Sequence, residues 1–173
     1  SKLPVFKHED NDIPVGNFII IDPSNDKHNS DAVTIAYFEI YDTVPVCMHL
    51  IEDRLSPGET IRKALTLALT KNCRLIAIES NAYQYSLLYW FNFITAQLGI
   101  VGVNPVEIYS GSLSKNTRIV SMFKSLQAGE ILIHADCKTA VFSQISAFNP
   151  LKRDNTDGIL DCLTYAPKVI ELY

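Results

Sequence analysis

Short apolar runs alternate with amphipathic stretches along most of the chain. Residues 18–21 and 75–78 are continuous apolar runs rich in isoleucine, which is typical of strands buried on both faces. Residues 32–41 and 44–51 also favour β structure, and the two polar residues between them predict a hairpin. The remaining pattern predicts strands at 105–109 and 131–133, and helices from 56 to about 69, at 83–98, at about 114–126, at about 138–147 and at about 156–169.

The order of these elements indicates an α/β fold. Three strands with hairpin-like connections come first, and strands that alternate with helices follow, which implies a mixed central sheet flanked by helices. Residues 1–16 are polar, contain two prolines and show no period, so we expect an arm or linker there and a single domain over residues 17–173. The serine at position 1 suggests a fragment of a longer protein.

Composition excludes several classes of protein. Apolar residues make up 47% of the chain and charged residues 20%, which is too hydrophobic for disorder, and no apolar run is long enough to cross a bilayer. The net charge of -4 argues against a protein that coats nucleic acid, but not against a metal-dependent nuclease, whose bound cations reverse the local field. The four cysteines are too far apart for a zinc site or a disulfide framework, and there is no GxxxxGK[ST] loop for ATP hydrolysis.

Two of the predicted strands end directly in an acid. Asp22 follows the run at 18–21, and Glu79 follows the run at 75–78. If these strands are parallel neighbours, as a crossover helix between them permits, both carboxylates emerge at the same end of the sheet, where open α/β sheets place their sites. Two carboxylates at the end of an apolar sheet are costly unless they are solvated, paired or bound to a cation.

The last predicted helix offers a third acid. Asp154, Asp157 and Asp161 recur at spacings of three and four, so they would share one helical face. Acids of this kind suit Mg²⁺ or Mn²⁺, and two ions about 4 Å apart can stabilise both the attacking and the leaving oxygen in phosphodiester hydrolysis. Each acid also has a purely structural interpretation as a turn residue or cap, and Asp157 could favour a helix N-terminus that Asn155 or Thr156 caps.

Four segments carry a family resemblance: residues 19–24 with 30–31, residues 75–81, residues 115–119 and residues 157–166. Together they resemble the C-terminal nuclease domain of the large terminase subunit of tailed phages and herpesviruses. The resemblance covers nearly the whole chain from residue 17 onward. It implies an α/β fold of the ribonuclease H-like class, with a mixed central sheet flanked by helices.

The same resemblance implies a role for each acid. Asp22 would be the central ligand that bridges two ions, Glu79 the ligand on one side and Asp157 the helical ligand, so these three are the expected catalytic and metal-binding residues. Asp161 would support the site indirectly or act as the alternative ligand, because many terminases have two adjacent acids where this chain has Asp157 followed by glycine. Asp31 is either a further ligand or a solvated residue at the start of a strand.

Basic residues near these acids are candidates for binding DNA. Lys115 and Arg118 lie three residues apart at the start of a predicted helix, where they could contact phosphate or form a solvated face. Lys152 and Arg153 come shortly before the helical acids and are better placed to hold DNA near the metals. The aromatic residues of 83–93 are expected to pack in the core, because base stacking would need exposed rings.

By this resemblance, we expect a divalent-metal-dependent endonuclease that cuts concatemeric viral double-stranded DNA during genome packaging, by hydrolysis with two Mg²⁺ or Mn²⁺ ions. The expected partners are DNA, an ATPase domain in the full chain, the small terminase subunit and the portal, with no membrane. The site of action would be the infected host cell where capsids assemble, which is the cytoplasm for a phage and the nucleus for a herpesvirus. Two alternatives stay open: another ribonuclease H-like nuclease, such as a junction resolvase or a ribonuclease, and a catalytically inactive scaffold that binds a partner protein.

Overall fold

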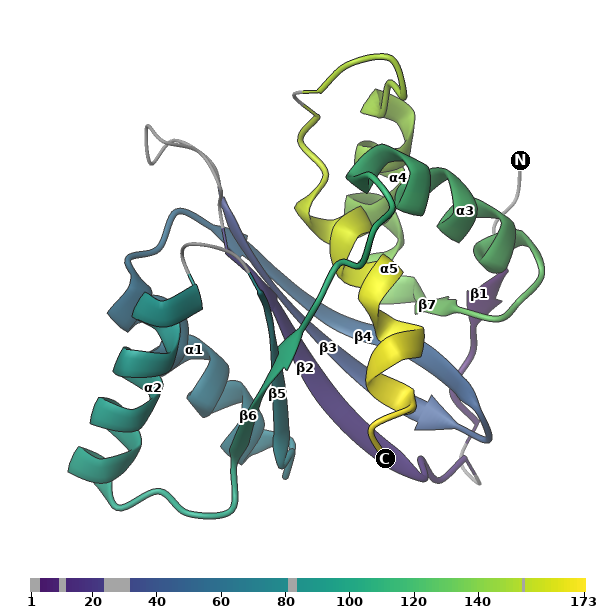
Figure 1. Cartoon of the computed structure of the whole chain (residues 1–173). Coiled ribbons are helices and arrows are strands. Elements are labelled where there is room, and N and C mark those ends of the chain that lie inside the picture. The colour runs from purple at the N-terminus through teal and green to yellow at the C-terminus, as the bar shows by residue number, and fades with distance from the viewer. Residues whose placement is uncertain (1–3, 10–11, 24–31, 81–83, 154) are drawn as a thin grey trace.

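The computed structural model describes residues 4–9, 12–23, 32–80, 84–153 and 155–173, which form a mixed sheet with helices on both faces (Figure 1). Asp31 and Asp154 lie outside the described residues. The strands are β1 (Val5–Phe6), β2 (Gly16–Asp22), β3 (Val33–Tyr41), β4 (Val44–Asp53), β5 (Leu75–Glu79), β6 (Asn104–Ile108) and β7 (Leu132–His134). The helices are α1 (Pro57–Thr70), α2 (Gln84–Leu98), α3 (Lys115–Gln127), the 3-10 turn η1 (Ala135–Cys137), α4 (Lys138–Ala147) and α5 (Gly158–Ile170).

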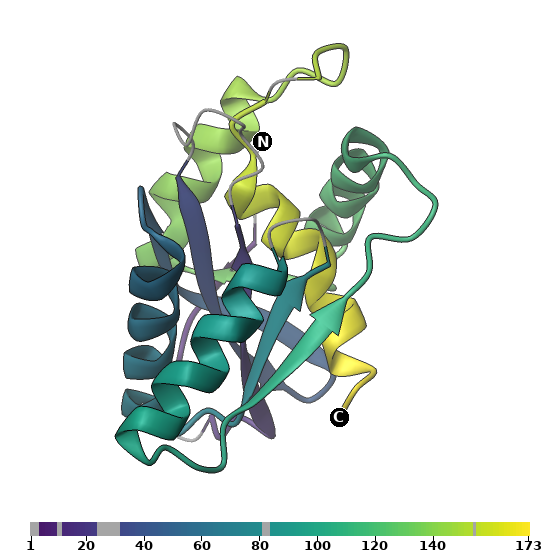
Figure 2. The same ribbon diagram turned by 60° about the vertical axis from the view of Figure 1, so that its left-hand side comes forward.

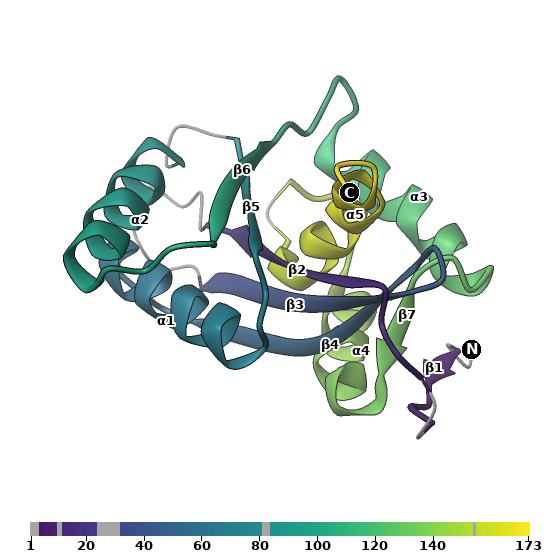
Figure 3. The same cartoon turned by 90° about the horizontal axis from the view of Figure 1, so that it is seen from below.

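The sheet separates two hydrophobic cores. Its strand order is β1-β7-β4-β3-β2-β5-β6. Helices α1 and α2 lie side by side on one face (Figure 2), and α3, α4 and α5 lie on the other (Figure 3). Side chains of β2 alternate between the cores, so that Ile19 and Ile21 pack under α1 and α2, and Phe18 and Ile20 pack under α5. The prediction of a strand buried on both faces is confirmed.

The strand pairing brings the two strand-end acids together. Strands β2, β3 and β4 pair antiparallel in sequence, as the hairpin pattern predicts, whereas β5 pairs with β2 in parallel. Ile21 of β2 is the register partner of Ile78 of β5. The next residue on each strand is an acid, Asp22 on β2 and Glu79 on β5. The predicted mixed sheet is therefore confirmed, and the condition under which the two acids were expected to emerge together, that β2 and β5 are parallel neighbours, is met.

The N-terminal segment contributes to the sheet, which we did not expect. We predicted no regular structure before residue 17, but Val5 and Phe6 form β1 and pair in parallel with Ile133 and His134 of β7 at the edge of the sheet. The ring of Phe6 also packs 4.8 Å from the ring of Tyr41. A strand of two residues is too short to show alternation, so no periodic pattern marks it in the sequence.

Two helix predictions need correction. The last helix begins at Gly158, later than predicted, so Asp157 is its N-cap residue and does not lie within the helix. On α2, Phe91 is buried as expected, but Tyr89 and Phe93 stack on each other in exposed positions, because only one face of this helix can pack against α1 and the sheet. Among the described residues, no helix combines the length and the apolar character needed to cross a membrane.

Candidate metal centre

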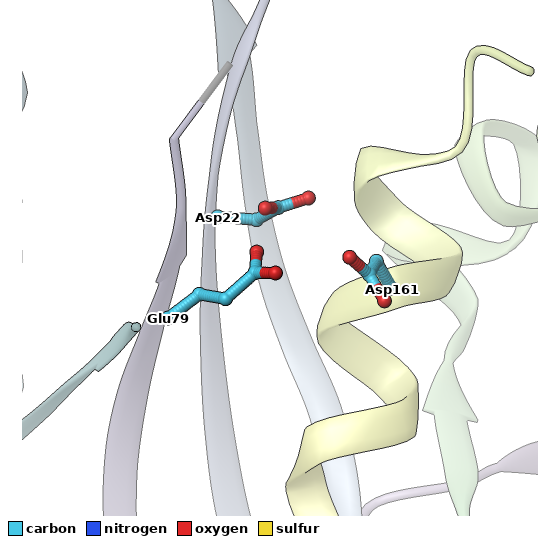
Figure 4. Close-up of side chains that lie close together, drawn as sticks. All are labelled: Asp22, Glu79 and Asp161. Carbon is cyan, nitrogen blue, oxygen red and sulfur yellow. The ribbon is translucent and has the colours of Figure 1, made fainter. Parts of the chain in front are cut away.

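Strand geometry directs two acids to the same face of the sheet. Side chains two residues apart on a strand point to the same side. Ile20 of β2 and Ala77 of β5 both pack in the core under α5. Asp22 and Glu79 each come two residues later, so both carboxylates also point toward α5 (Figure 4).

Helix α5 brings a third acid to this pair. Asp161 lies in the first turn of α5 and faces the ends of β2 and β5 (Figure 4). Asp22, Glu79 and Asp161 each offer one carboxylate oxygen, and these three atoms lie within 4.8 Å of one another. The three residues are buried, with exposed fractions of 8%, 7% and 2%. We call this set the three-acid cluster.

The members of the three-acid cluster oppose each other's ionisation. Burial, a hydrogen bond with Glu79 and the negative charges of Glu79 and Asp161 raise the pKa of Asp22 well above its usual value. Burial and the charge of Glu79 also raise the pKa of Asp161 to about 6, and the guanidinium of Arg118 offsets only part of this rise. A cation bound between the carboxylates would remove the repulsion, so the electrostatics of the cluster favour cation binding.

Unpartnered oxygens in the site fit a hard divalent cation. Tyr165 donates a hydrogen bond of 3.0 Å to Oε1 of Glu79, but Oε2 of Glu79 is buried without a partner, and so is Oδ2 of Asp157. Buried polar atoms without a partner are rare because their desolvation is costly. Carboxylate oxygens are the ligands that Mg²⁺ and Mn²⁺ prefer, so the residues present fit the expected ions.

A partly buried arginine orients the helical acid of the cluster. Nη2 of Arg118 donates to Oδ1 of Asp161 at 2.9 Å and to the hydroxyl of Tyr165 at 3.2 Å. Since Tyr165 donates in turn to Glu79, Arg118 is connected to two members of the cluster. Its side chain is only 11% exposed. In this structure Arg118 therefore contacts Asp161 and Tyr165, whereas the sequence left open a contact with phosphate and a solvated face.

Asp157 is paired with a lysine and stands outside the three-acid cluster. Nζ of Lys115 lies 2.8 Å from Oδ1 of Asp157. Burial by itself would lower the pKa of Lys115, but the hydrogen bond to Asp157 and the nearby negative charges outweigh burial and raise it. Of the two acids considered from the sequence as the third ligand, Asp161 thus lies with Asp22 and Glu79, and Asp157, the N-cap residue of α5, lies beside a charged lysine.

A glycine allows α5 to approach the sheet. A Cβ added to Gly158 would collide with Oγ1 of Thr34, which is the register partner of Asp22 on β3, and would lie 3.5 Å from Oδ2 of Asp22. An acid at position 158 would therefore crowd Asp22.

A buried glutamine of α4 holds the start of α5. Oε1 of Gln144 accepts hydrogen bonds from the backbone N–H groups of Ile159 at 2.9 Å and Leu160 at 3.3 Å. Its Nε2 donates to Glu52 at 2.6 Å. These bonds replace a side-chain cap, because Asp157 makes no capping hydrogen bond at the N-terminus of α5. Gln144 thereby fixes the turn that carries Asp161.

Three residues of the site were missed in the sequence. Tyr165 lies four residues after Asp161 on the same helix, and this spacing was a signal that could have identified it. Thr34 and Gln144 had no such signal, because only the pairing of β3 with β2 and the packing of α4 on α5 bring them to the acids.

Exposed cations lie beside the site on the segment that precedes α5. Lys152 and Arg153 are both exposed. Nδ2 of Asn116, in the first turn of α3, donates to the carbonyl oxygen of Lys152 at 2.7 Å, and Nδ2 of Asn155 donates to the same oxygen at 2.9 Å. The segment is therefore held against the start of α3, next to Lys115.

Solved structures of viral nucleases share this fold over most of the chain. The human cytomegalovirus terminase nuclease domain matches with a TM-score of 0.67 and 13% identity, over 96% of this chain and 89% of that chain, and it has also been solved Mn-soaked. The large terminase of a thermophilic bacteriophage matches with a TM-score of 0.63 and 13% identity, over 92% of this chain but 41% of that chain. The fowlpox virus Holliday junction resolvase matches with a TM-score of 0.57 and 13% identity, over 90% of this chain and 98% of that chain.

These likenesses establish the fold. No protein-family model matches the sequence, and no curated protein sequence does so either. The chain has the ribonuclease H-like fold of terminase nuclease domains and of a junction resolvase, as the sequence resemblance predicted. Within that fold it carries a buried acidic cluster suited to metal ions.

Proposed function

We propose that the chain is a divalent-metal-dependent endonuclease that cuts concatemeric viral double-stranded DNA during genome packaging. The observation that carries the proposal is the three-acid cluster, in which acids from β2, β5 and α5 meet at one end of the sheet. The likeness of the fold to terminase nuclease domains supports the same conclusion. The acids are far apart in the sequence, so their meeting in a buried position is unlike a chance surface cluster.

In this proposal the acids hold Mg²⁺ or Mn²⁺, with Asp22 as the central ligand between Glu79 and Asp161, and with Asp157 available to a second ion. When bound, such ions stabilise the negative charge that develops on phosphate as water displaces the leaving oxygen. Arg118 and Tyr165 keep the oxygens of Asp161 and Glu79 oriented. No nucleophilic side chain is required, because water is the attacking group.

We further propose that Lys152 and Arg153 contact DNA phosphates beside the acids. Both are exposed, and the hydrogen bonds of Asn116 and Asn155 to the backbone of Lys152 hold their segment next to the site. Contacts to phosphate carry no base information, so this arrangement suits cutting with little sequence preference.

The proposed setting is a packaging motor. This chain spans 39% of the thermophilic bacteriophage large terminase that was solved in complex with ATP-gamma-S. We propose that the nuclease works in one protein with an ATPase domain, together with a small terminase subunit and a portal, where capsids assemble in an infected cell. This setting rests on the likeness of the fold, and the chemistry of the site does not depend on it.

A cleavage assay tests the proposal. Plain duplex, four-way junction and RNA–DNA hybrid are incubated with Mn²⁺, with Mg²⁺ and with a chelator. We expect the plain duplex to be cut in both metals and to survive in the chelator. Asp22→Asn and Glu79→Gln should slow cleavage by at least about 10³-fold, because each removes a carboxylate that would hold the ions on which transition-state stabilisation depends. Asp53→Asn is the matched control, since Asp53 is an exposed acid at the end of β4.

The outcomes separate the alternatives. Strong preference for the four-way junction would favour a resolvase, which the match over 98% of the fowlpox enzyme makes the second candidate. Preference for the hybrid would favour a ribonuclease. A chain that cuts none of the substrates while circular dichroism shows it folded would contradict the nuclease proposal and favour a partner-binding scaffold.

A further inference from the structure

Two cations on α3 pair with two acids at the start of α5, and the two ion pairs differ in exposure. Lys115 and Arg118 lie about one turn apart on α3, Asp157 is the N-cap residue of α5 and Asp161 lies in its first turn, and the ion pairs measure 2.8 Å and 2.9 Å. Arg118 is 11% exposed and also bonds to the hydroxyl of Tyr165. Lys115 is 38% exposed, and its ion pair with Asp157 reaches the site from the solvent side. The arginine is thus less exposed than the lysine and is held by more partners.

The charge balance of the site favours one divalent ion in the free protein. Among the described residues, the buried acids are Asp22, Glu79, Asp157 and Asp161, and the cations in ion pairs with them are Lys115 on Asp157 and Arg118 on Asp161. With all six side chains ionised, two negative charges remain, and one divalent ion neutralises them. A second divalent ion would leave two positive charges in excess in a buried site, which is costly unless a cation departs or an anion enters.

Lys115 is the cation able to depart. An ammonium on a flexible four-carbon stem exchanges partners more readily than the partly buried guanidinium of Arg118, which is held by three acceptors. The first turn of α3 also bonds to the exposed segment that carries Lys152 and Arg153. A DNA phosphate at this segment would therefore lie next to Lys115, and it would bring the anion that the charge balance requires.

We propose that the ammonium of Lys115 occupies the position of the second cation beside Asp157 until DNA binds, and this proposal rests on the proposed nuclease function. In the free protein one divalent ion binds at the three-acid cluster, and Lys115 keeps Asp157 occupied. A DNA phosphate then draws Lys115 away from Asp157 and frees this carboxylate for a second ion. The lysine thus couples the second metal site to the substrate.

Mn²⁺ binding, measured by isothermal titration calorimetry, tests this role without any cleavage. We expect one ion per wild-type chain and two ions per chain in Lys115→Met, with the affinity of the second site raised at least about tenfold. Lys115→Asn and Lys115→Gln serve as second variants in case the methionine disturbs the fold, which circular dichroism checks. Lys124→Met is the matched control, because Lys124 is an exposed lysine in the last turn of the same helix, and it should bind one ion.

A double variant and an added DNA duplex extend the test. Asp157→Asn combined with Lys115→Met should return to one ion, because the freed carboxylate is the one removed. Adding a nuclease-resistant phosphorothioate duplex to the wild type should raise its uptake to two ions. A wild type that takes two ions without DNA, a Lys115→Met variant that takes one, or a duplex without effect would overturn the role of Lys115 and leave the proposed nuclease intact. Absence of Mn²⁺ binding in every variant would overturn both.

Discussion

The two faces of the sheet bury different chemistry. On the face covered by α1 and α2, the buried polar residue among those described is Thr60, whose hydroxyl donates to the carbonyl of Ser56 at 2.8 Å. On the face covered by α5 the described buried polar residues are Asp22, Thr34, Glu79, Gln144, Asp157 and Asp161. The described buried side-chain atoms without a hydrogen-bond partner, which belong to Thr34, Glu79, Arg118 and Asp157, also lie on the α5 side.

One face of the sheet therefore mainly stabilises the fold, and the other face carries the candidate site. The α1–α2 face follows the rule that buried polar groups are satisfied, and nearly all of what it buries is apolar. The α5 face breaks the rule at several atoms that lie close together. Folded proteins tolerate such violations mainly where a ligand or ion completes the site, so the location of the violations is itself an indication of function.

Mutations on the two faces should have opposite consequences, and this is the strongest effect that we expect. Ile61→Ala on α1 should lower the free energy of unfolding by about 3 kcal/mol, because Ile61 is fully buried, while the folded fraction keeps its cleavage rate. Asp22→Asn should show the reverse, with no loss of stability, because it removes a carboxyl whose ionisation Glu79 opposes. Urea denaturation measures both, and Leu69→Ala, at an exposed position of α1, is the control. Equal destabilisation by Ile61→Ala and Asp22→Asn would contradict the division between the faces.

A smaller change in the free energy of unfolding is expected when the pH is changed. Because the pKa of Asp22 is raised and that of Asp161 is raised to about 6, the folded protein holds protons that the unfolded chain has already lost. This contribution to stability is complete below the unfolded pKa and is lost as pH rises through the folded pKa, so metal-free protein should lose about 1 to 2 kcal/mol between pH 5 and pH 7.

Thermal unfolding with a chelator and with Mn²⁺ checks this pH dependence. Mn²⁺ binds the deprotonated acids, so it should raise the melting temperature more at pH 7 than at pH 5. Asp161→Asn should flatten the chelator profile, and Asp53→Asn should leave it unchanged. A metal-free domain that grows more stable over this range would contradict the assignment.

Substitutions at the contact between α5 and β3 should cause the smallest of these changes in stability. Gly158→Ala should cost about 1 kcal/mol or slightly more, because the new Cβ collides with Oγ1 of Thr34. Thr34→Ala in the same protein removes the colliding oxygen and should restore most of the loss, since the remaining Cβ of residue 34 lies at 3.4 Å. A double-mutant cycle in urea measures the coupling. Independent, additive effects would show that Gly158 is not needed for this contact.

Local sequence pattern was enough to predict most of the elements and the two strand-borne acids. The isoleucine runs at 18–21 and 75–78 predicted strands buried on both faces, and each run ended in the acid that the structure places in the site. The hairpin, the crossover helix and the parallel pair followed from local pattern and chain connectivity, and the family resemblance pointed to the fold that the structural matches bear out. Such features depend on neighbours along the chain, so they can be inferred without coordinates.

The different surroundings of Asp157 and Asp161 could be seen only in the folded chain. Both acids were visible near the last helix, but their surroundings come from remote segments: Lys115 of α3 lies beside Asp157, and the ends of β2 and β5 lie beside Asp161. The packing of Gly158 on Thr34 and the bonds of Gln144 set where the helix starts and how it turns. The burial of an acid, the charges around it and its nearest partner are properties of the folded molecule. They depend on residues that are remote in the sequence and that no sequence spacing connects.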